Sequence, residues 1–221
     1  MIKKENNKPA TVRITSGLYK NKRLLIPDAT RPVRERVKLA VFSILSNKIL
    51  NADILDLFAG TGNLGFEALS RGANSSTFVE NDYEAINLLI KNAENLSEDK
   101  LNINILKYDA TDFVNDISKT KDENVNLSEK NTKANLSRKY EIKTRISNIP
   151  TNYDIVFIDA PYNLTINHVL KNLDRLMKNS SIAVYFKSSQ NNTNISELNS
   201  KLKIYDSRKY GITTVDFIEK T

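Results

Sequence analysis

The chain of 221 residues contains no cysteine. Disulfide bonds, thiolate metal sites and a cysteine nucleophile are therefore excluded together. No apolar run approaches the roughly 18 residues that a membrane-spanning helix needs. Residues 1–10 are polar and lysine-rich, without the apolar core of a secretory signal. We therefore expect a cytoplasmic protein that has no membrane partner.

Histidine is almost as scarce, because the chain has a single one, His168. It falls on a predicted helix beyond the motifs described below, and we interpret it as an ordinary surface or packing residue. No metal site is predicted. The contents of 40% hydrophobic and 27% charged residues are typical of a soluble globular protein. The length suits one α/β domain with a modest addition.

Negative charge is scarce at the start of the chain. Residues 1–50 hold 12 Lys or Arg and 3 Asp or Glu, a balance of +9, whereas residues 51–221 have a balance of −2. The basic excess therefore lies wholly in the N-terminal segment. A polyanionic partner bound through this segment is one interpretation. A basic surface that only favours solubility is the other.

The pattern of apolar residues changes near residue 51. Before it, residues 11–26 are typical of a β-hairpin, and a helix is predicted from Arg31-Pro32 to Leu50, with proline suiting its first turn. After it, short apolar runs alternate with amphipathic stretches, which predicts a parallel sheet with helical crossovers. We therefore divide the chain into an N-terminal hairpin and helix (1–50) and an α/β domain (51–221). Strands are predicted at 54–58, 76–80, 103–107, 153–158 and 181–186, a closing antiparallel pair at 202–209 and 213–218, and helices at 64–70, 83–96 and 166–177.

One stretch interrupts this alternation. Residues 118–152 are rich in Asn, Lys, Ser, Thr and Glu, and they separate the third predicted strand and its helix from the fourth strand. Connections of this length are unusual in compact domains. We interpret the stretch as a mobile surface insertion of low complexity, with a substrate-contacting loop as the alternative.

The first predicted strand of the α/β domain runs into the sequence AGTGNLG, with glycines at positions 60, 62 and 65. Glycine lets the backbone turn tightly and lets a ligand approach it closely. Asp56 precedes the glycines, where its carboxylate suits the ammonium of an amino acid better than a pyrophosphate, although it could also merely cap the loop. The loop as a whole predicts a ligand site.

Two more carboxylates end the next two predicted strands. Glu80, 18 residues beyond Gly62, can accept hydrogen bonds from both ribose hydroxyls of a nucleoside, and Asp109 can accept from an adenine amino group. The ends of neighbouring parallel strands line one crevice. The glycine spacing also fits the GxGxxG pattern of nicotinamide and flavin enzymes, which is weak on its own. The loop has no Lys or Arg to meet a phosphate, which counts against that alternative.

The fourth strand ends in Asp159-Ala160-Pro161-Tyr162. An FxGxG loop followed by an Asp-Pro-Pro-Tyr type tetrad is the pattern of amino-group methyltransferases. Asp159 and the backbone carbonyl of Ala160 can accept hydrogen bonds from an exocyclic amine, which favours its nucleophilic geometry and stabilises the positive charge that develops. Tyr162 offers a ring face on which an extruded base can stack. Alone, the tetrad could also be a plain turn.

Taken together, the chain resembles the bacterial 16S rRNA guanine-N2 methyltransferases that act on guanine 966. The resemblance rests on RITSGLYKNKRL (13–24), RPVRERVKLAVFSIL (31–45), LDLFAGTGNLGFEALSRGA (55–73), FVEND (78–82), FIDAPY (157–162) and YGITTVDFIE (210–219). It implies a Rossmann-like class I fold that depends on S-adenosylmethionine (SAM). The fold would hold a seven-stranded, mostly parallel sheet with a C-terminal antiparallel strand. It also implies a monomer that acts on 16S rRNA within the 30S subunit.

The resemblance assigns residues to three roles. The catalytic residues would be the tetrad 159–162. The cofactor would be bound by Asp56, Phe58, Ala59, Gly60, Thr61, Gly62, Asn63, Glu80, Asn81, Asp109 and Ala110. The RNA backbone would be gripped by Arg13, Lys20, Lys22, Arg23, Arg31, Arg34, Arg36 and Lys38.

The sequence departs from the family pattern at three places: Ala160 replaces the first proline of the tetrad, Val33 replaces a threonine, and residues 118–152 are additional. Other interpretations therefore remain. The amine could belong to adenine N6 in DNA or RNA, or to a glutamine side chain. Alternatively, the site could have lost its catalytic activity, and the protein could be a non-catalytic RNA-binding assembly factor. A dehydrogenase is the most distant alternative.

Overall fold

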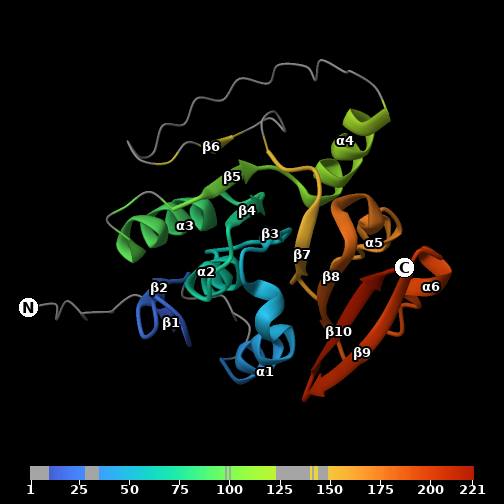
Figure 1. Ribbon diagram of the computed structural model, residues 1–221, viewed down its shortest axis with the longest axis horizontal. Helices are drawn as coiled ribbons and strands as arrows, with labels where there is room; N and C mark the ends of the chain where they lie inside the picture. Colours follow the sequence, from blue (N-terminus) through green and yellow to red (C-terminus); the bar gives the residue numbers. More distant parts are fainter. Residues whose placement is uncertain are drawn as a thin grey trace, which may run out of the picture.

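The computed structural model describes residues 10–27, 35–97, 99, 101–122, 140, 142–143 and 149–221, of which 118–122 are described by their backbone alone. One large mixed sheet forms its centre (Figure 1). In spatial order its strands are β6 (Ile142–Lys143), β5 (Ile103–Lys107), β4 (Ser75–Glu80), β3 (Asp53–Asp56), β7 (Tyr153–Ile158), β8 (Met177–Ser188), β10 (Thr213–Lys220) and β9 (Leu202–Tyr210). Neighbours from β6 to β8 run parallel, and β10 runs antiparallel to both β8 and β9.

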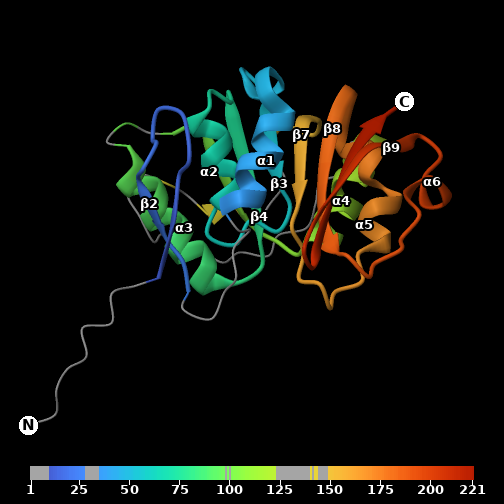
Figure 2. The ribbon, with the colours of Figure 1, turned by 90° about the horizontal axis from the view of Figure 1, so that it is seen from below.

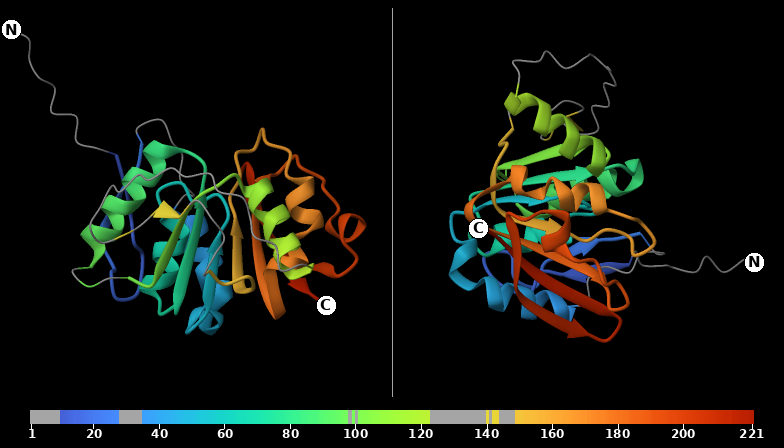
Figure 3. Two further views of the ribbon diagram at one scale, coloured as in Figure 1. Left: turned by 90° about the horizontal axis from the view of Figure 1, so that it is seen from above. Right: turned by 90° about the vertical axis from the view of Figure 1, so that its right-hand side faces the viewer.

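Helices cover both faces of the sheet. The α-helices are α1 (Glu35–Leu45), α2 (Asn63–Ser70), α3 (Tyr83–Leu96), α4 (Ala110–Asp122), α5 (Asn167–Lys171) and α6 (Ile195–Leu198), and 3₁₀ turns occupy Ser46–Ile49 and Leu173–Leu176. Figure 3 shows α1 and α4 on opposite sides of the sheet. Within the described residues, every helix is too short or too polar to span a bilayer.

Alternation along the central strands explains the two apolar layers, because successive side chains of a strand point to opposite faces. On β7, Ile155 and Phe157 pack with α1 and α2, whereas Val156 and Ile158 pack with α4 and α5. Strands buried on both faces must be apolar throughout. The apolar run YDIVFI therefore predicts a buried strand from the sequence alone.

The N-terminal hairpin consists of β1 (Thr11–Arg13) and β2 (Arg23–Leu25), as predicted. It lies against α2 and α3 (Figure 2). The backbone amide of Leu18 donates to Ser70 O at 2.7 Å. On α3, Asn92 Oδ1 accepts from Leu25 N at 2.7 Å and Asn92 Nδ2 donates to Leu25 O at 3.0 Å. The hairpin is therefore joined to the α/β domain by buried polar contacts.

The structure corrects the predicted sheet, which has eight strands instead of seven. The additional strand β6 comes from the stretch 118–152 and pairs with β5. Tyr140, from the same stretch, is 4% exposed and its hydroxyl accepts from Leu101 N at 3.1 Å. The described part of this stretch is thus partly core, and α4 continues into it as far as Asp122. Its residues 123–139, 141 and 144–148 lie outside the described ones.

Several other element bounds differ from the prediction. The strand predicted at 54–58 ends at Asp56, the helix predicted to Leu50 ends at Leu45, and the helix predicted at 166–177 is the short α5 followed by a 3₁₀ turn. Met177, predicted as the last residue of that helix, is the first residue of strand β8, which is longer than the strand predicted at 181–186. Each change falls at an element end, where capping and 3₁₀ geometry decide the boundary.

Candidate active site

A cavity of about 680 Å³ lies at the carboxyl ends of β3, β4, β5 and β7. It brings together the predicted catalytic tetrad 159–162 with nearly all the predicted cofactor residues. Its lining includes Asp56, Phe58, Ala59, Gly60, Thr61, Asn63, Glu80, Asn81, Asp109 and Ala110. The remaining predicted residue, Gly62, belongs to the turn that shapes this edge of the cavity. Open α/β sheets bind ligands at this edge.

The glycines of the loop after β3 serve two structural purposes. Gly60 and Gly62 have φ angles of +52° and +87°, in the left-handed region that favours glycine. Gly65 instead permits close packing, since a Cβ there would lie 2.2 Å from the Phe78 ring. The first two glycines therefore turn the chain, and the third lets α2 approach β4.

Asp56 is buried beneath the first turn of α2, 1% exposed. Its Oδ2 accepts a hydrogen bond from Gly65 N at 3.2 Å, whereas its buried Oδ1 has no partner among the described residues. Burial, with a contribution from the nearby charges of Asp159 and Glu80, raises the pKa of this carboxyl to about 8 despite the hydrogen bond from Gly65 N. A cationic ligand group would relieve both the unpaired oxygen and the repulsion between carboxylates.

Glu80 joins the end of β4 to the glycine loop. Its Oε2 accepts from Gly60 N at 2.7 Å, and its Oε1 accepts from Asn81 N and Asp82 N, each at 2.8 Å. These bonds fix the carboxylate at the cavity wall. Each carboxylate oxygen has two lone pairs, so Oε2 retains acceptor capacity toward a ligand hydroxyl.

Asp109 occupies the corresponding place after β5. Its Oδ1 accepts from Thr111 N at 2.8 Å at the start of α4, which is a helix-capping contact. The carboxylate lines the cavity as well. Asp109 is therefore held by the helix start and keeps a second oxygen for a donor such as an amino group.

The tetrad follows β7, the neighbour of β3 in the sheet, and lines the same cavity as the glycine loop. Asp159 lines the same cavity as Gly60 and Glu80, as the proposed chemistry requires. Burial raises the pKa of the Asp159 carboxyl to about 7. Tyr162 is 45% exposed, and its hydroxyl forms a 2.6 Å hydrogen bond with Thr213 Oγ1 at the start of β10. A planar ring is thus held at the cavity mouth.

Several lining residues were absent from the predicted set. They include Ile26 and Pro27 after the hairpin, Leu164 after the tetrad, and Ile212 and Thr213 from the β9–β10 turn. Ile212 is 64% exposed. These segments are distant in sequence, and only the pairing of β10 with β8 brings the turn to the cavity. The sequence YGITT (210–214) predicts a closing strand pair and contributes to the family resemblance, but it does not indicate that the turn reaches the cavity.

Of the predicted RNA-binding residues, five are exposed: Arg13, Lys20, Lys22, Arg23 and Arg36. Arg13 pairs with Glu35, Arg23 donates to Thr11 Oγ1 at 3.1 Å, and Lys22 donates to Leu96 O at 2.8 Å. Such surface contacts are weak and leave the cations accessible. Arg31 and Arg34 lie outside the described residues.

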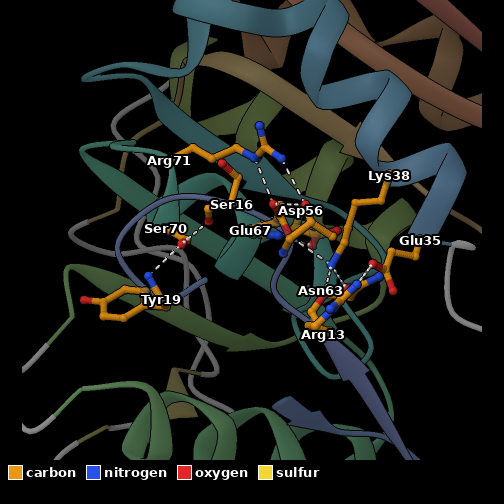
Figure 4. A network of polar contacts seen from close by, with 12 residues as sticks. Arg13, Ser16, Tyr19, Glu35, Lys38, Asp56, Asn63, Glu67, Ser70 and Arg71 are labelled. Carbon is orange, nitrogen blue, oxygen red and sulfur yellow. Dashed lines mark hydrogen bonds and ion pairs between the residues drawn. The ribbon is translucent and has the colours of Figure 1, made fainter. Parts of the chain in front are cut away.

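The prediction for Lys38 is wrong. Its side chain is 0% exposed and pairs with Glu67 Oε2 at 3.0 Å (Figure 4). A lysine in this position cannot reach a phosphate on the surface. Lys38 follows Val37 on the inner face of α1, and its charge is compensated inside the protein instead of by RNA.

Comparison with known proteins places the chain in a family. The family described as Conserved hypothetical protein 95 matches residues 12–128 and 117–219, which is most of the sequence. The chain belongs to this family. A relative from Rickettsia prowazekii, named an uncharacterized methylase, is 33% identical over 227 residues, which cover 90% of this chain and 94% of that protein.

Relatives named ribosomal RNA small subunit methyltransferase D support the same assignment. The protein from Buchnera aphidicola subsp. Acyrthosiphon pisum is 31% identical over 185 residues, covering 80% of this chain and 78% of that protein. The one from Haemophilus influenzae is 38% identical over 110 residues, covering 49% and 57%. The family expected from the sequence motifs is thus confirmed, and it is a family of methyltransferases.

Solved structures confirm the fold class. A putative methyltransferase from Escherichia coli superposes with a TM-score of 0.71 at 21% identity, covering 96% of this chain and 98% of that one. A putative methyltransferase complexed with SAH reaches a TM-score of 0.66 at 13% identity, covering 100% of this chain and 58% of that one. The fold is that of class I methyltransferases.

Proposed function

We propose that the protein transfers a methyl group from SAM to the exocyclic N2 of a guanine in 16S rRNA, with guanine 966 in the 30S particle as the expected target. The observation that carries the proposal is that Asp159 faces the same cavity as the glycine loop and Glu80. The relatives named ribosomal RNA small subunit methyltransferase D supply the substrate class.

The lining residues fit the parts of SAM. The unpartnered Asp56 Oδ1 would accept from its ammonium, Glu80 from its ribose hydroxyls, and Asp109 from its adenine amino group. When bound, SAM supplies a methyl group on a positively charged sulfur. Four acidic side chains line this cavity, and they match a ligand with that charge: Asp56, Glu80, Asp109 and Asp159.

The tetrad would act on the base. Asp159 accepts a hydrogen bond from the exocyclic amine, and the carbonyl of Ala160 accepts from its second N–H. Because burial holds the pKa of Asp159 near neutrality, at about 7, this carboxylate can also take the proton that the amine loses. Tyr162, held by Thr213 at the cavity mouth, provides the stacking surface for the extruded base.

Transfer of labelled methyl groups from SAM tests this function. The protein is incubated with unmodified 30S particles, naked 16S rRNA, DNA and ribosomal proteins, and the products are hydrolysed and separated. We expect label in N2-methylguanine from the particles. Label in N6-methyladenine or in glutamine would assign one of the alternative amines. The absence of label in every substrate, together with RNA binding, would favour the non-catalytic assembly factor.

Neutralising the hairpin cations tests the RNA contacts. We expect the triple substitution Arg13→Gln, Lys22→Gln and Arg23→Gln to weaken RNA binding and to flatten the dependence of log K on log salt by about 2 to 3 units, because each lost phosphate contact removes about 0.7 to 0.9. Filter binding between low and physiological salt measures the slope. The matched control neutralises three exposed lysines on or next to α5 and β9, at the opposite end of the molecule from the hairpin (Figure 1): Lys171, Lys201 and Lys203. An unchanged slope in the hairpin variant would contradict the assignment.

A further inference from the structure

Lys38 of α1 makes three hydrogen bonds inside the protein. Its Nζ donates to Asn63 Oδ1 at 2.8 Å and to Arg13 O at 2.7 Å, and it lies 3.0 Å from Glu67 Oε2. Figure 4 shows the three acceptors grouped around it. An ammonium has three donors, so its hydrogen-bonding capacity is fully used. The position of this cation is therefore fixed by the hairpin at Arg13 and by two residues of α2, Asn63 and Glu67.

Glu67 keeps its charge in this network. Burial opposes ionisation, but contacts from Lys38, Thr15 and Arg71 outweigh it and hold the pKa of Glu67 below its usual value. Thr15 N donates at 2.8 Å and Arg71 Nε at 2.8 Å. Glu67 would therefore retain compensating partners if Lys38 were replaced by an uncharged residue.

The contact with Lys38 determines the orientation of the Asn63 amide. Lysine can only donate, so the amide must present its oxygen to Lys38 and its Nδ2 to the other side. Asn63 is 8% exposed and lines the cavity, and its Nδ2 is buried without a hydrogen-bond partner in the described part of the chain. A donor that is left unpaired inside a protein is unfavourable, so this group calls for a ligand acceptor.

The unpaired donor has an unpaired acceptor near it. Asp56 Oδ1 is also buried without a partner, and the other oxygen of this carboxylate bonds Gly65 N, two residues beyond Asn63. Both side chains line the same cavity. The α-amino acid end of a ligand carries one carboxylate and one ammonium, so it would satisfy both groups at once.

We propose that Asn63 Nδ2 binds the carboxylate of the α-amino acid end of SAM beside the Asp56 carboxylate, and that Lys38 is the positioning residue that orients Asn63. This inference rests on the proposed function for the identity of the ligand. Asn63 touches the ligand, whereas Lys38 acts through Asn63 and ties it to the backbone of the hairpin at Arg13.

Calorimetric titration with S-adenosylhomocysteine (SAH, the product left by SAM) and with decarboxylated SAH tests the inference. We expect Asn63→Ala and Lys38→Met each to lower the affinity for SAH at least about tenfold, the value of one charge-assisted hydrogen bond. Affinity for the decarboxylated ligand should stay within about twofold of wild type, because its binding lacks this bond. The double variant should lose no more than Asn63→Ala alone, since the two residues act as one unit.

Two further variants make the test decisive. Ser70→Ala is the control, because Ser70 Oγ bonds Ser16 O and Tyr19 N in the hairpin without lining the cavity, and it should leave both affinities unchanged. Asn63→Asp keeps an acceptor for Lys38 but repels a carboxylate, so it should prefer the decarboxylated ligand. If Lys38→Met fails to fold, the ligand preference of Asn63→Asp still tests whether Asn63 binds the carboxylate.

Equal losses for both ligands in Lys38→Met, or an unchanged SAH affinity in Asn63→Ala, would overturn the inference. Such a result leaves the methyl-transfer assay of the wild-type protein untouched. Conversely, a wild-type protein that binds SAH with the expected ligand preference but methylates no RNA would refute the proposed function and retain this subsite.

Discussion

Replacing Asp159 with alanine is expected to lower the rate of methyl transfer at least about a thousandfold, while the affinity for SAH stays within a few-fold of wild type. The carboxylate would contact the reacting amine, and loss of a preorganised group aimed at developing charge costs rates of this order. The cofactor would keep Asp56, Glu80 and Asp109. Single-turnover transfer from labelled SAM and calorimetry with SAH measure the two quantities separately.

A matched control lies on β7, the strand that Asp159 follows. Asp154 stands on β7, near its amino end, where its Oδ2 accepts from Asp53 N at 2.8 Å and contacts Lys178 at 2.7 Å. Asp154→Asn should leave the transfer rate unchanged. Full activity in Asp159→Ala would refute the catalytic role of Asp159, and equal losses in both variants would indicate a general disturbance of β7.

The pH profile distinguishes a chemical role of Asp159 from a structural one. Burial raises the pKa of its carboxyl to about 7, and only the ionised form accepts a hydrogen bond from the amine with both oxygens. With SAM saturating, the rate should therefore rise as pH increases through 7 or somewhat below, since a bound cation favours the carboxylate. In Asp159→Asn the remaining slow rate should lack this rise.

The second large effect is expected at Asp56. Asp56→Asn should weaken SAH binding about a hundredfold or more, because the ligand ammonium would lose its buried counter-charge. The same substitution should stabilise the protein without ligand at pH 8. Burial raises the pKa of Asp56 to about 8 from an ordinary value near 4, so the wild-type fold carries a penalty for ionisation that asparagine does not.

The sign of the stability change follows from proton linkage. Below pH 4 the Asp56 carboxyl is protonated in the folded and unfolded chains, and it causes no penalty. As pH rises from 4 to 8, the unfolded chain ionises first and the folded state loses relative stability. The difference in unfolding free energy between variant and wild type should therefore grow over this range. This difference would reach about 2 to 5 kcal/mol at pH 8. The lower end applies if the buried amide of the new asparagine lacks a hydrogen-bond partner, which itself destabilises the variant.

Thermal denaturation across pH 4 to 8.5 measures this difference. Asp53→Asn on the same strand is the control with the opposite sign. Burial of Asp53 is outweighed by hydrogen bonds from Asn74, Lys178 and Ser75, which lower its pKa. Its loss should destabilise the protein at neutral pH. If Asp56→Asn melts at a lower temperature than wild type at pH 8, this would contradict the interpretation that the ionised Asp56 destabilises the ligand-free fold.

The sequence was informative wherever a segment carries its own pattern. Helix α3 and strands β5 and β7 have the predicted bounds, because one amphipathic periodicity and two apolar runs suffice to define them. The carboxylates at positions 56, 80, 109 and 159 could be placed together because parallel strands end at one edge of a sheet. Their burial and pKa shifts could not be foreseen, since these depend on the surrounding packing.

Two features lacked any local signal. Strand β6 has only two residues and exists because β5 offers it a free edge. Lys38 looked like one more cation of a basic segment, because its partner Glu67 stands 29 positions away on another helix. The distribution of charges along a sequence cannot show which lysine side chain is buried, because the burial of Lys38 depends on the packing of α1 against α2.

The hydrogen bond between Tyr162 and Thr213 joins residues 51 positions apart. Thr213 begins β10, which lies between β8 and β9, so the ring is anchored to the interior of the sheet as well as to its own loop. A loop with alanine in place of proline at position 160 gains backbone freedom without releasing the ring. The contact with β10 therefore fixes the Tyr162 ring by a route that does not pass through the backbone of position 160.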